Sequence, residues 1–257
     1  MERKKSSVDA LILAGASNSG QLSECSPVLN KALIDVGSKT LLEYVVDALK
    51  ASLGIGRIVV VGPNKLIRER IGGDAIDIIV ESGDSFIDNI IIGLDAFEGA
   101  QQILMVTSDI PLLTPAAVDD FLERCSQREA QVYYSVISKE TVEKRYPGTK
   151  RTYVRLADGE FTGGNVALVS LDVIRSLKSV LKKVTQMRKK PWQLGTLLGA
   201  RCMMKFLLGT LSIDDIERRV EKAFNFKGAA IITPYPEIGV DVDKPEDITF
   251  VKELLGG

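Results

Sequence analysis

The chain has 257 residues, enough to bury one substantial core, and we expect a single domain over residues 1–257. Its 33 basic and 34 acidic side chains nearly balance, so no overall field attracts the protein to nucleic acid or to an anionic membrane. The absence of histidine excludes Ser-His-Asp and Cys-His catalysis, and every zinc site that depends on imidazole.

Short apolar runs alternate with helix-length amphipathic segments through the first half of the chain. Continuous runs of Val, Ile and Leu are typical of strands that are buried on both faces. Strands are predicted at 10–14, 58–61, 76–80 and 103–106, and helices at 40–53, 64–71, 85–97 and from Thr114-Pro115 onward. This order predicts an α/β fold: a three-layer Rossmann-like, mixed but mostly parallel sheet with helices on both faces. Ligands of such sheets bind beyond the carboxyl ends of the strands.

The second half of the chain departs from this repeat. The run Gln131-Val-Tyr-Tyr-Ser-Val-Ile is followed by a polar stretch at 139–151 and a turn at 157–160, and we expect antiparallel additions to the sheet here. From 171 to 226 the pattern is helical, with Ser212-Ile-Asp-Asp typical of a capping box, which predicts a helical insert subdomain. A last strand at 229–232 and a final helix from Pro245 close the chain.

The cysteines and the apolar segments bear on location. The three cysteines form no C-x-x-C pair and are far apart: Cys25, Cys125 and Cys202. They predict neither a disulfide framework nor a metal knuckle, and we expect a reducing, cytoplasmic environment. The charged N-terminus lacks the long apolar stretch of a secretory signal. The most apolar region, 194–211, is interrupted by Arg201 and Lys205, so no membrane span is expected.

A loop of small residues follows the first predicted strand. It reads Leu13-Ala-Gly-Ala-Ser-Asn-Ser-Gly20, and its backbone amides could approach a nucleotide closely because few side chains stand in the way. It lacks both G-x-G-x-x-G and G-K-[ST], and such a loop can equally be a simple tight turn. Lys31 follows among apolar residues, where it either faces a ligand or extends from a strand edge into solvent.

Three aspartates are candidate metal ligands. Asp109 ends the fourth predicted strand, where a carboxylate can hold magnesium between two phosphates, although it can also be a turn residue before proline. Asp241 and Asp243 precede the last helix and present alternate carboxylates near one point. Asp243 could instead complement the dipole of the helix that starts at Pro245.

Five stretches, taken together and in order, point to a family. They are Leu13-Ala-Gly, Lys31-Ala-Leu-Ile with Leu41-Leu-Glu-Tyr-Val, Ser108-Asp-Ile-Pro-Leu-Leu, Gly163-Gly-Asn-Val-Ala-Leu and Asp241-Val-Asp-Lys-Pro-Glu-Asp-Ile. This set resembles the MobA-like nucleotidyltransferases of the GT-A-like sugar-nucleotide pyrophosphorylase superfamily. The resemblance covers the chain except for the insert at 171–226.

The resemblance implies a role for each stretch. The nucleotide would be bound by the first loop, through Leu13, Ala14, Gly15, Ala16 and Ser17, and by the segment after the third strand, through Ser82, Gly83 and Ser85. Lys31 and Asp109 would be the catalytic pair, with Lys31 neutralising the phosphate chain. Mg²⁺ or Mn²⁺ would be held by Asp109, Asp241 and Asp243, and the acceptor would meet Gly163, Gly164 and Asn165.

The loop departs from the family pattern Leu-Ala-Gly-Gly-x-Ser-x-Arg. Ala16 replaces the second glycine, and Gly20 stands where the arginine is expected. That arginine stabilises charge on the triphosphate, so its loss implies slow catalysis, a replacement cation or no catalysis. A basic cluster in the insert either supplies the missing charge or forms a solvated helix face: Lys182, Lys183, Arg188, Lys189 and Lys190.

The expected activity is transfer of a nucleoside monophosphate from a nucleoside triphosphate to a phosphorylated small molecule, with release of pyrophosphate. A phosphate acceptor is already ionised at neutral pH, so positioning and charge neutralisation suffice. Two alternatives stay open: a nucleotide-sugar-dependent glycosyltransferase, although Thr107-Ser-Asp109 stands where its Asp-x-Asp is expected, and a non-catalytic nucleotide-binding protein. The apolar segment at 192–208 could pack in the core, form a lid, pair two subunits as a homodimer or receive a lipid-like acceptor.

Overall fold

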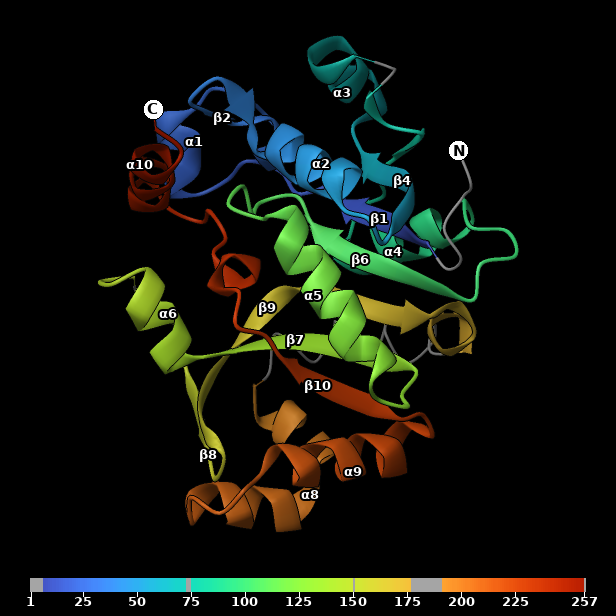
Figure 1. The fold of residues 1–257 in the computed structure, drawn as a ribbon, viewed down its shortest axis with the longest axis vertical. Helices are drawn as coiled ribbons and strands as arrows, with labels where there is room; N and C mark the ends of the chain where they lie inside the picture. Colours follow the sequence, from blue (N-terminus) through green and yellow to red (C-terminus); the bar gives the residue numbers. More distant parts are fainter. Residues whose placement is uncertain (1–6, 73–74, 150, 177–190, 257) are drawn as a thin grey trace.

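A computed structural model describes residues 7–72, 75–149, 151–176 and 191–256, with the backbone alone at 191–198 (Figure 1). Its centre is an eight-stranded sheet. The strands are β1 (Val8–Leu13), β4 (Ile55–Gly62), β5 (Ile78–Glu81), β6 (Gln102–Thr107), β7 (Val132–Ser138), β8 (Val154–Leu156), β9 (Gly159–Ser170) and β10 (Gly228–Ile232). A separate two-stranded hairpin joins β2 (Asp35–Val36) and β3 (Lys39–Thr40).

The strand order is β10-β7-β9-β6-β1-β4-β5, with β8 paired to β9. The pairs within β6-β1-β4-β5 and the pair β10-β7 are parallel, whereas β9 runs antiparallel to β6, β7 and β8. Leu13 pairs with both Val61 and Thr107, so β1, β4 and β6 reach their carboxyl ends at the same level. The mixed, mostly parallel sheet and its antiparallel additions are therefore confirmed.

Helices surround this sheet. They are α1 (Gln21–Cys25), α2 (Leu41–Ala51), α3 (Asn64–Ile71), α4 (Phe86–Leu94), α5 (Pro115–Ser126), α6 (Lys139–Arg145), α8 (Pro191–Leu207), α9 (Ile213–Phe224) and α10 (Pro245–Leu254). Thr114 caps α5 before a proline, and Ser212 forms a capping box with Asp215, as the sequence predicts. The polar stretch after β7 begins with a helix, α6, that the sequence pattern did not indicate. Ser138 caps the start of this helix.

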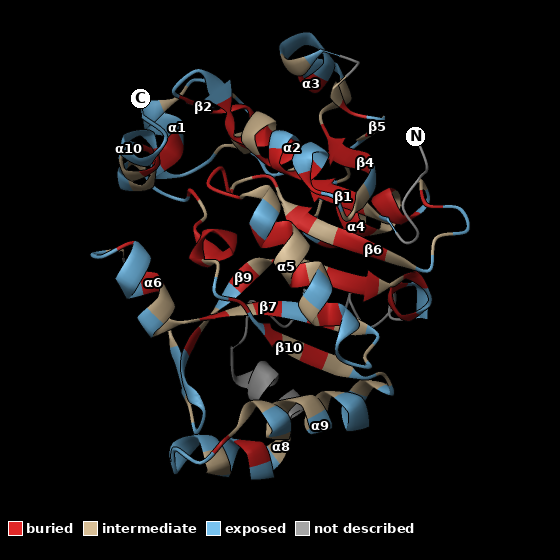
Figure 2. Ribbon diagram, viewed as in Figure 1, coloured by how far each residue is buried: buried red, intermediate tan, exposed pale blue. Residues whose placement is uncertain are grey.

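Alternating residues of the strands supply two hydrophobic layers. Ala10 and Ile12 of β1 point into a core shared with α2 and α5, while Leu11 and Leu13 point to the opposite face, which α4 covers. Figure 1 shows the helices on the two faces, and Figure 2 shows that the central strands are the most buried part of the fold. The predicted three-layer arrangement is thus observed, and its hydrophobic layers hold the carboxyl ends of the strands in place.

Helix α9 lies beside β10, at one edge of the sheet, and α8 packs against α9 (Figure 1). They confirm the helical character of the predicted insert, and α8 is kinked at Gly199, where φ is 76°. The basic cluster at 182–190 lies outside the described residues. The division of the chain into a main domain and an insert at 171–226 stays a prediction. Among the helices that the structure describes, none has the length and apolar character needed to cross a membrane.

Candidate active site

The loop after β1 is fixed by backbone contacts with its surroundings. The Ala14 amide donates to the Val61 carbonyl at 2.8 Å, and the Asn30 side chain donates to the Ala14 carbonyl, also at 2.8 Å. The Lys31 amide in turn donates to the Ala16 carbonyl at 3.0 Å. These bonds tie the small-residue loop to the segment that carries Lys31, so both reach the carboxyl edge of the sheet together.

The same loop packs against the segment that follows β5. A Cβ atom added to Gly15 would lie 2.2 Å from Nδ2 of Asn89 and 2.9 Å from Cβ of Ser82, so only glycine fits this approach. Asn89 is buried, and its Oδ1 accepts a 2.8 Å bond from the Gly83 amide. We call these two segments, 14–17 and 82–85, the nucleotide-side wall. The two predicted nucleotide-binding stretches are therefore adjacent, and Asn89 links them.

Ser85 has a local structural task in this wall. Its hydroxyl accepts from the Asp88 amide at 3.1 Å and donates to the Asp88 carboxylate at 2.6 Å, which caps the start of α4. A nucleotide contact made by the Ser85 side chain would compete with this cap. The role predicted for Ser85 stays a prediction.

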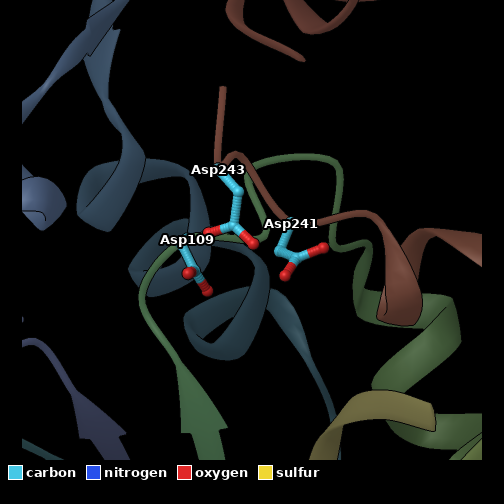
Figure 3. Close-up of side chains that lie close together, drawn as sticks. All are labelled: Asp109, Asp241 and Asp243. Carbon is cyan, nitrogen blue, oxygen red and sulfur yellow. The ribbon is translucent and has the colours of Figure 1, made fainter. Parts of the chain in front are cut away.

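Three carboxylates converge at the edge of the sheet. Asp109 follows β6, whereas Asp241 and Asp243 come from the segment after the 3-10 helix η3 (Pro236–Gly239), and Figure 3 shows the three side chains facing a common point. One oxygen from each lies within 4.8 Å of the others. The Val242 amide donates to the Asp109 carbonyl at 2.9 Å, a backbone bond that holds the two distant segments together.

Two cations neutralise much of this charge. Nζ of Lys31 lies 2.6 Å from Oδ2 of Asp109 and 2.5 Å from Oδ1 of Asp243, and the Lys31 side chain is only 12% exposed. Nη1 of Arg151 contacts Oδ1 of Asp241. Each of the three carboxylates therefore has a cationic partner, although three negative charges face only two positive ones.

Burial and pairing act against each other on the pKa values of these groups. Burial by itself would lower the pKa of Lys31, but Asp109 and Asp243 hold it above its ordinary value. Burial raises the pKa of Asp241, an effect that Arg151 opposes and that the other two carboxylates strengthen. Burial would also raise the pKa of Asp243, yet the hydrogen bond and the charge of Lys31 bring it below its ordinary value.

The donor set suits a hard divalent cation. Mg²⁺ and Mn²⁺ prefer carboxylate oxygens, and the three converging aspartates offer them. Oδ1 of Asp109 is buried and has no hydrogen-bond partner among the described residues, so it is an acceptor without a donor. The excess of one negative charge over Lys31 and Arg151 favours a further cation at the same point. The residues present therefore fit the metal that the family resemblance implies.

A polar cleft of about 680 Å³ opens beside the carboxylates. Its lining includes Tyr134, Thr149, Arg151, Thr152, Gly163, Gly164, Asn165, Asp241, Asp243 and Lys244. A Cβ atom added to Gly163 would lie 2.5 Å from the Tyr134 hydroxyl, and one added to Gly164 would lie 2.2 Å from Oγ of Ser135. We call this lining the acceptor-side wall. The glycines keep the backbone of β9 close to β7 and leave the cleft open.

The structure brings most of the predicted site residues to one place. Lys31, Asp109, Asp241 and Asp243 form a contiguous charged cluster, with the nucleotide-side wall on one flank and Gly163, Gly164 and Asn165 on the other. For Asp243, the alternative as a helix-dipole partner is weakened. The first turn of α10 instead has Asp247, whose Oδ2 accepts from the amides of Asp243 and Lys244 at 2.9 Å.

Sequence reasoning missed two residues of this region. Arg151 lies in a polar stretch that had no motif, and only its contact with Asp241 reveals its place. Asn89 could have been noticed as the single amide in the helical run Phe86-Ile-Asp-Asn-Ile-Ile-Ile, where a buried polar side chain needs a partner.

Comparison with known proteins settles the family. Residues 10–207 match the MobA-like NTP transferase domain. The chain belongs to this family. A structure described as a hypothetical transferase from Thermus thermophilus shares 35% sequence identity with it and has a TM-score of 0.84, and the match covers 94% of this chain and 99% of the other. The family resemblance read from the motifs is therefore confirmed. A search of curated proteins finds no match.

Two more distant structures share the fold of this MobA-like chain. The 4-diphosphocytidyl-2C-methyl-D-erythritol synthase from Anaerococcus prevotii has 13% identity and a TM-score of 0.61, covering 98% of this chain and 97% of its own. A CMP:2-keto-3-deoxy-manno-octonic acid synthetase, solved with CTP, has 14% identity and a TM-score of 0.60, covering 97% and 99%. At these identities the likeness concerns the fold alone.

Proposed function

We propose that this chain transfers a nucleoside monophosphate group from a nucleoside triphosphate to a phosphorylated small-molecule acceptor, with release of pyrophosphate. The observation that carries the proposal is the position of the Lys31, Asp109, Asp241 and Asp243 cluster. It lies between a wall of small residues and an open polar cleft, so a donor nucleotide and an acceptor can meet beside it.

The loops and the charged cluster of the site have separate roles in this proposal. The backbone of 14–17 and of 82–83 receives the nucleotide, and the Lys31 ammonium neutralises charge on its phosphates. The aspartates hold Mg²⁺ or Mn²⁺, which, when bound, supplies positive charge to the phosphate oxygens. The carboxyl edge of the sheet keeps these groups in a fixed arrangement, so no reorganisation is needed as charge develops.

The acceptor-side wall offers cations to an anionic partner, beside four carboxylates that a metal ion and the cations would balance: Asp241, Asp243, Glu246 and Asp247. An ionised phosphate can attack the α-phosphorus without a general base, which agrees with a chain that has no histidine. Arg151 and Lys244 contribute positive charge to the cleft, and Asn165 contributes an amide. Attack at the α-phosphorus forms the new P–O bond as the bond to the pyrophosphate leaving group breaks.

The choice of triphosphate for a first experiment follows from the fold neighbours. Two of them are named for cytidine nucleotides, and one was solved with CTP. We therefore propose to test CTP first, followed by ATP, GTP and UTP, by the rise in melting temperature that each produces with Mg²⁺. The triphosphate that stabilises the protein most is then the donor used to search for the acceptor.

The deciding experiment measures pyrophosphate release with that triphosphate and a set of phosphorylated small molecules. Asp109→Asn should leave the fold intact and lower turnover by about 10²–10³-fold, because it removes a charge that acts on the reacting phosphates. Asp95→Asn is the matched control, since Asp95 is exposed and caps the end of α4 away from the cluster.

Three results would contradict the proposal. Unchanged turnover of Asp109→Asn would show that the cluster is not the catalytic site. Release of a nucleoside diphosphate from a nucleotide sugar would favour glycosyl transfer. Tight triphosphate binding without product, across all acceptors, would favour a non-catalytic nucleotide-binding protein.

A further inference from the structure

Arg151 connects the carboxylate cluster to the acceptor-side wall. It lies in the loop between α6 and β8, and its guanidinium contacts both the Asp241 carboxylate and, at 3.5 Å, the Asp241 carbonyl oxygen. The Arg151 and Asp241 side chains are 18% and 21% exposed. Arg151 also borders the polar cleft together with Tyr134 and Asn165. One guanidinium is therefore within reach of two different anions, the Asp241 carboxylate and any anion in the cleft.

The Asp241 carboxylate cannot serve Arg151 and a divalent cation equally well. Arg151 contacts its Oδ1, and an oxygen of the same carboxylate is a candidate ligand within the cluster. A cation bound to this carboxylate would compete with the guanidinium for its negative charge and would repel the positive charge of Arg151. Tight binding of a metal therefore requires Arg151 to move away from Asp241 or to lose part of its contact with it.

Arg151 would leave Asp241 most readily for another anion. A guanidinium that is mostly buried is costly to leave unpaired, so it must exchange one partner for another. Its planar fork of donors matches a phosphate as well as it matches a carboxylate. A phosphate in the cleft would have Tyr134, Asn165 and Arg151 among its neighbours, in the same cleft that Asp241 and Asp243 line.

From these contacts we propose that Arg151 determines specificity for a dianionic acceptor by exchanging Asp241 for the acceptor's phosphate. The exchange frees the Asp241 carboxylate for the divalent cation, so acceptor anion and cation bind cooperatively. Because the two bindings are linked, each tightens the other by the same factor. The inference rests on the proposed function, which provides the acceptor and the cation. It adds that the site binds the divalent cation tightly only when the acceptor's phosphate is bound.

The test measures Mn²⁺ binding to the full chain by the electron paramagnetic resonance signal of free Mn²⁺, without nucleotide. Sulfate serves as the dianion probe, and sodium chloride keeps the ionic strength equal. In the wild type, sulfate should tighten Mn²⁺ binding by about fivefold. Arg151→Gln should bind Mn²⁺ more tightly than the wild type without sulfate, and sulfate should have no further effect.

Two further variants serve as controls for the Mn²⁺ binding test. Arg57→Gln breaks an Arg–Asp pair of the same kind with Asp9 at the opposite end of the sheet, and should keep the wild-type response to sulfate. Arg151→Lys keeps the charge without the fork, and should show a weaker response than the wild type. This second variant keeps the proposal testable if Arg151→Gln does not fold.

The outcomes separate this inference from the proposed function. Mn²⁺ binding that depends on Asp109 but is insensitive to sulfate overturns the role of Arg151 and leaves the proposed function standing. A sulfate response that survives in Arg151→Gln also overturns it. Mn²⁺ binding that is unaffected by Asp109→Asn contradicts the assignment of the cluster itself, and so the proposed function as well.

Discussion

The two walls of the candidate site differ in how they are built. The nucleotide-side wall is made of small residues whose positions are set by close backbone packing, such as Gly15 against Ser82 and Asn89. The acceptor-side wall is wider and carries charge, with Arg151 and Lys244 beside the carboxylates. Steric fit shapes the first wall, whereas the second combines crowded glycines with charged side chains.

This difference indicates how each ligand would be selected. A wall of backbone amides and glycine discriminates by shape, because any added atom collides with its neighbours. A wall of charged side chains discriminates by the charge of the ligand and tolerates differences in its outline. We therefore expect substitutions in the first wall to affect the triphosphate and those in the second to affect the acceptor.

Among the substitutions that compare the two walls, the largest effect is expected at Lys31, which contacts both Asp109 and Asp243. Lys31→Met removes the cation shared by Asp109 and Asp243, and we expect turnover to fall by about 10²-fold and triphosphate affinity to fall with it. Pyrophosphate release and nucleotide titration measure the two effects. Lys39→Met is the matched control, because the Lys39–Asp47 pair is exposed and lies outside the cleft. Equal activity of the two variants would show that Lys31 has only a structural role.

A smaller effect, confined to the nucleotide-side wall, is expected from Gly15→Ala. The new methyl group would lie 2.2 Å from Nδ2 of Asn89, so the loop must shift, at a cost of about 1–3 kcal/mol. Triphosphate affinity measured by calorimetry should fall, while the KM for the acceptor changes little. Gly56→Ala is also crowded, with its methyl group 2.7 Å from Oδ1 of Asp9, but it lies at the opposite end of the sheet. It should lower stability and leave triphosphate affinity as it is.

The corresponding substitution in the acceptor-side wall is Gly164→Ala, for which we expect the smallest effect. Its methyl group would lie 2.2 Å from Oγ of Ser135 and 2.8 Å from Cγ2 of Ile238. Because β9 must shift to relieve this crowding and its Gly164 lines the cleft, we expect the KM for the acceptor to rise by about fivefold, equivalent to roughly 1 kcal/mol. Triphosphate affinity, followed by the same titration as for Gly15→Ala, should stay at the wild-type value. A loss of triphosphate affinity here would break the distinction between the two walls.

Much of the fold followed from local patterns. The apolar runs of β1, β4, β5 and β6 predicted buried parallel strands, and the capping residues Thr114 and Ser212 marked the starts of two helices. Helix α6 was missed because its start depends on the Ser138 cap in a stretch without apolar periodicity. Local signals of this kind are readable because they involve residues close together in the chain.

The sequence by itself determined the kinds of groups at the site: loop glycine, lysine and aspartates in the order of the MobA-like family, and no histidine. Only the tertiary structure decided which of them meet. The Val242–Asp109 backbone bond and the approach of Gly15 to Asn89 join segments far apart in the chain, and Arg151 reaches Asp241 across 90 residues. Such contacts depend on strand order and packing, because the spacing of residues along the chain does not fix their distance in space.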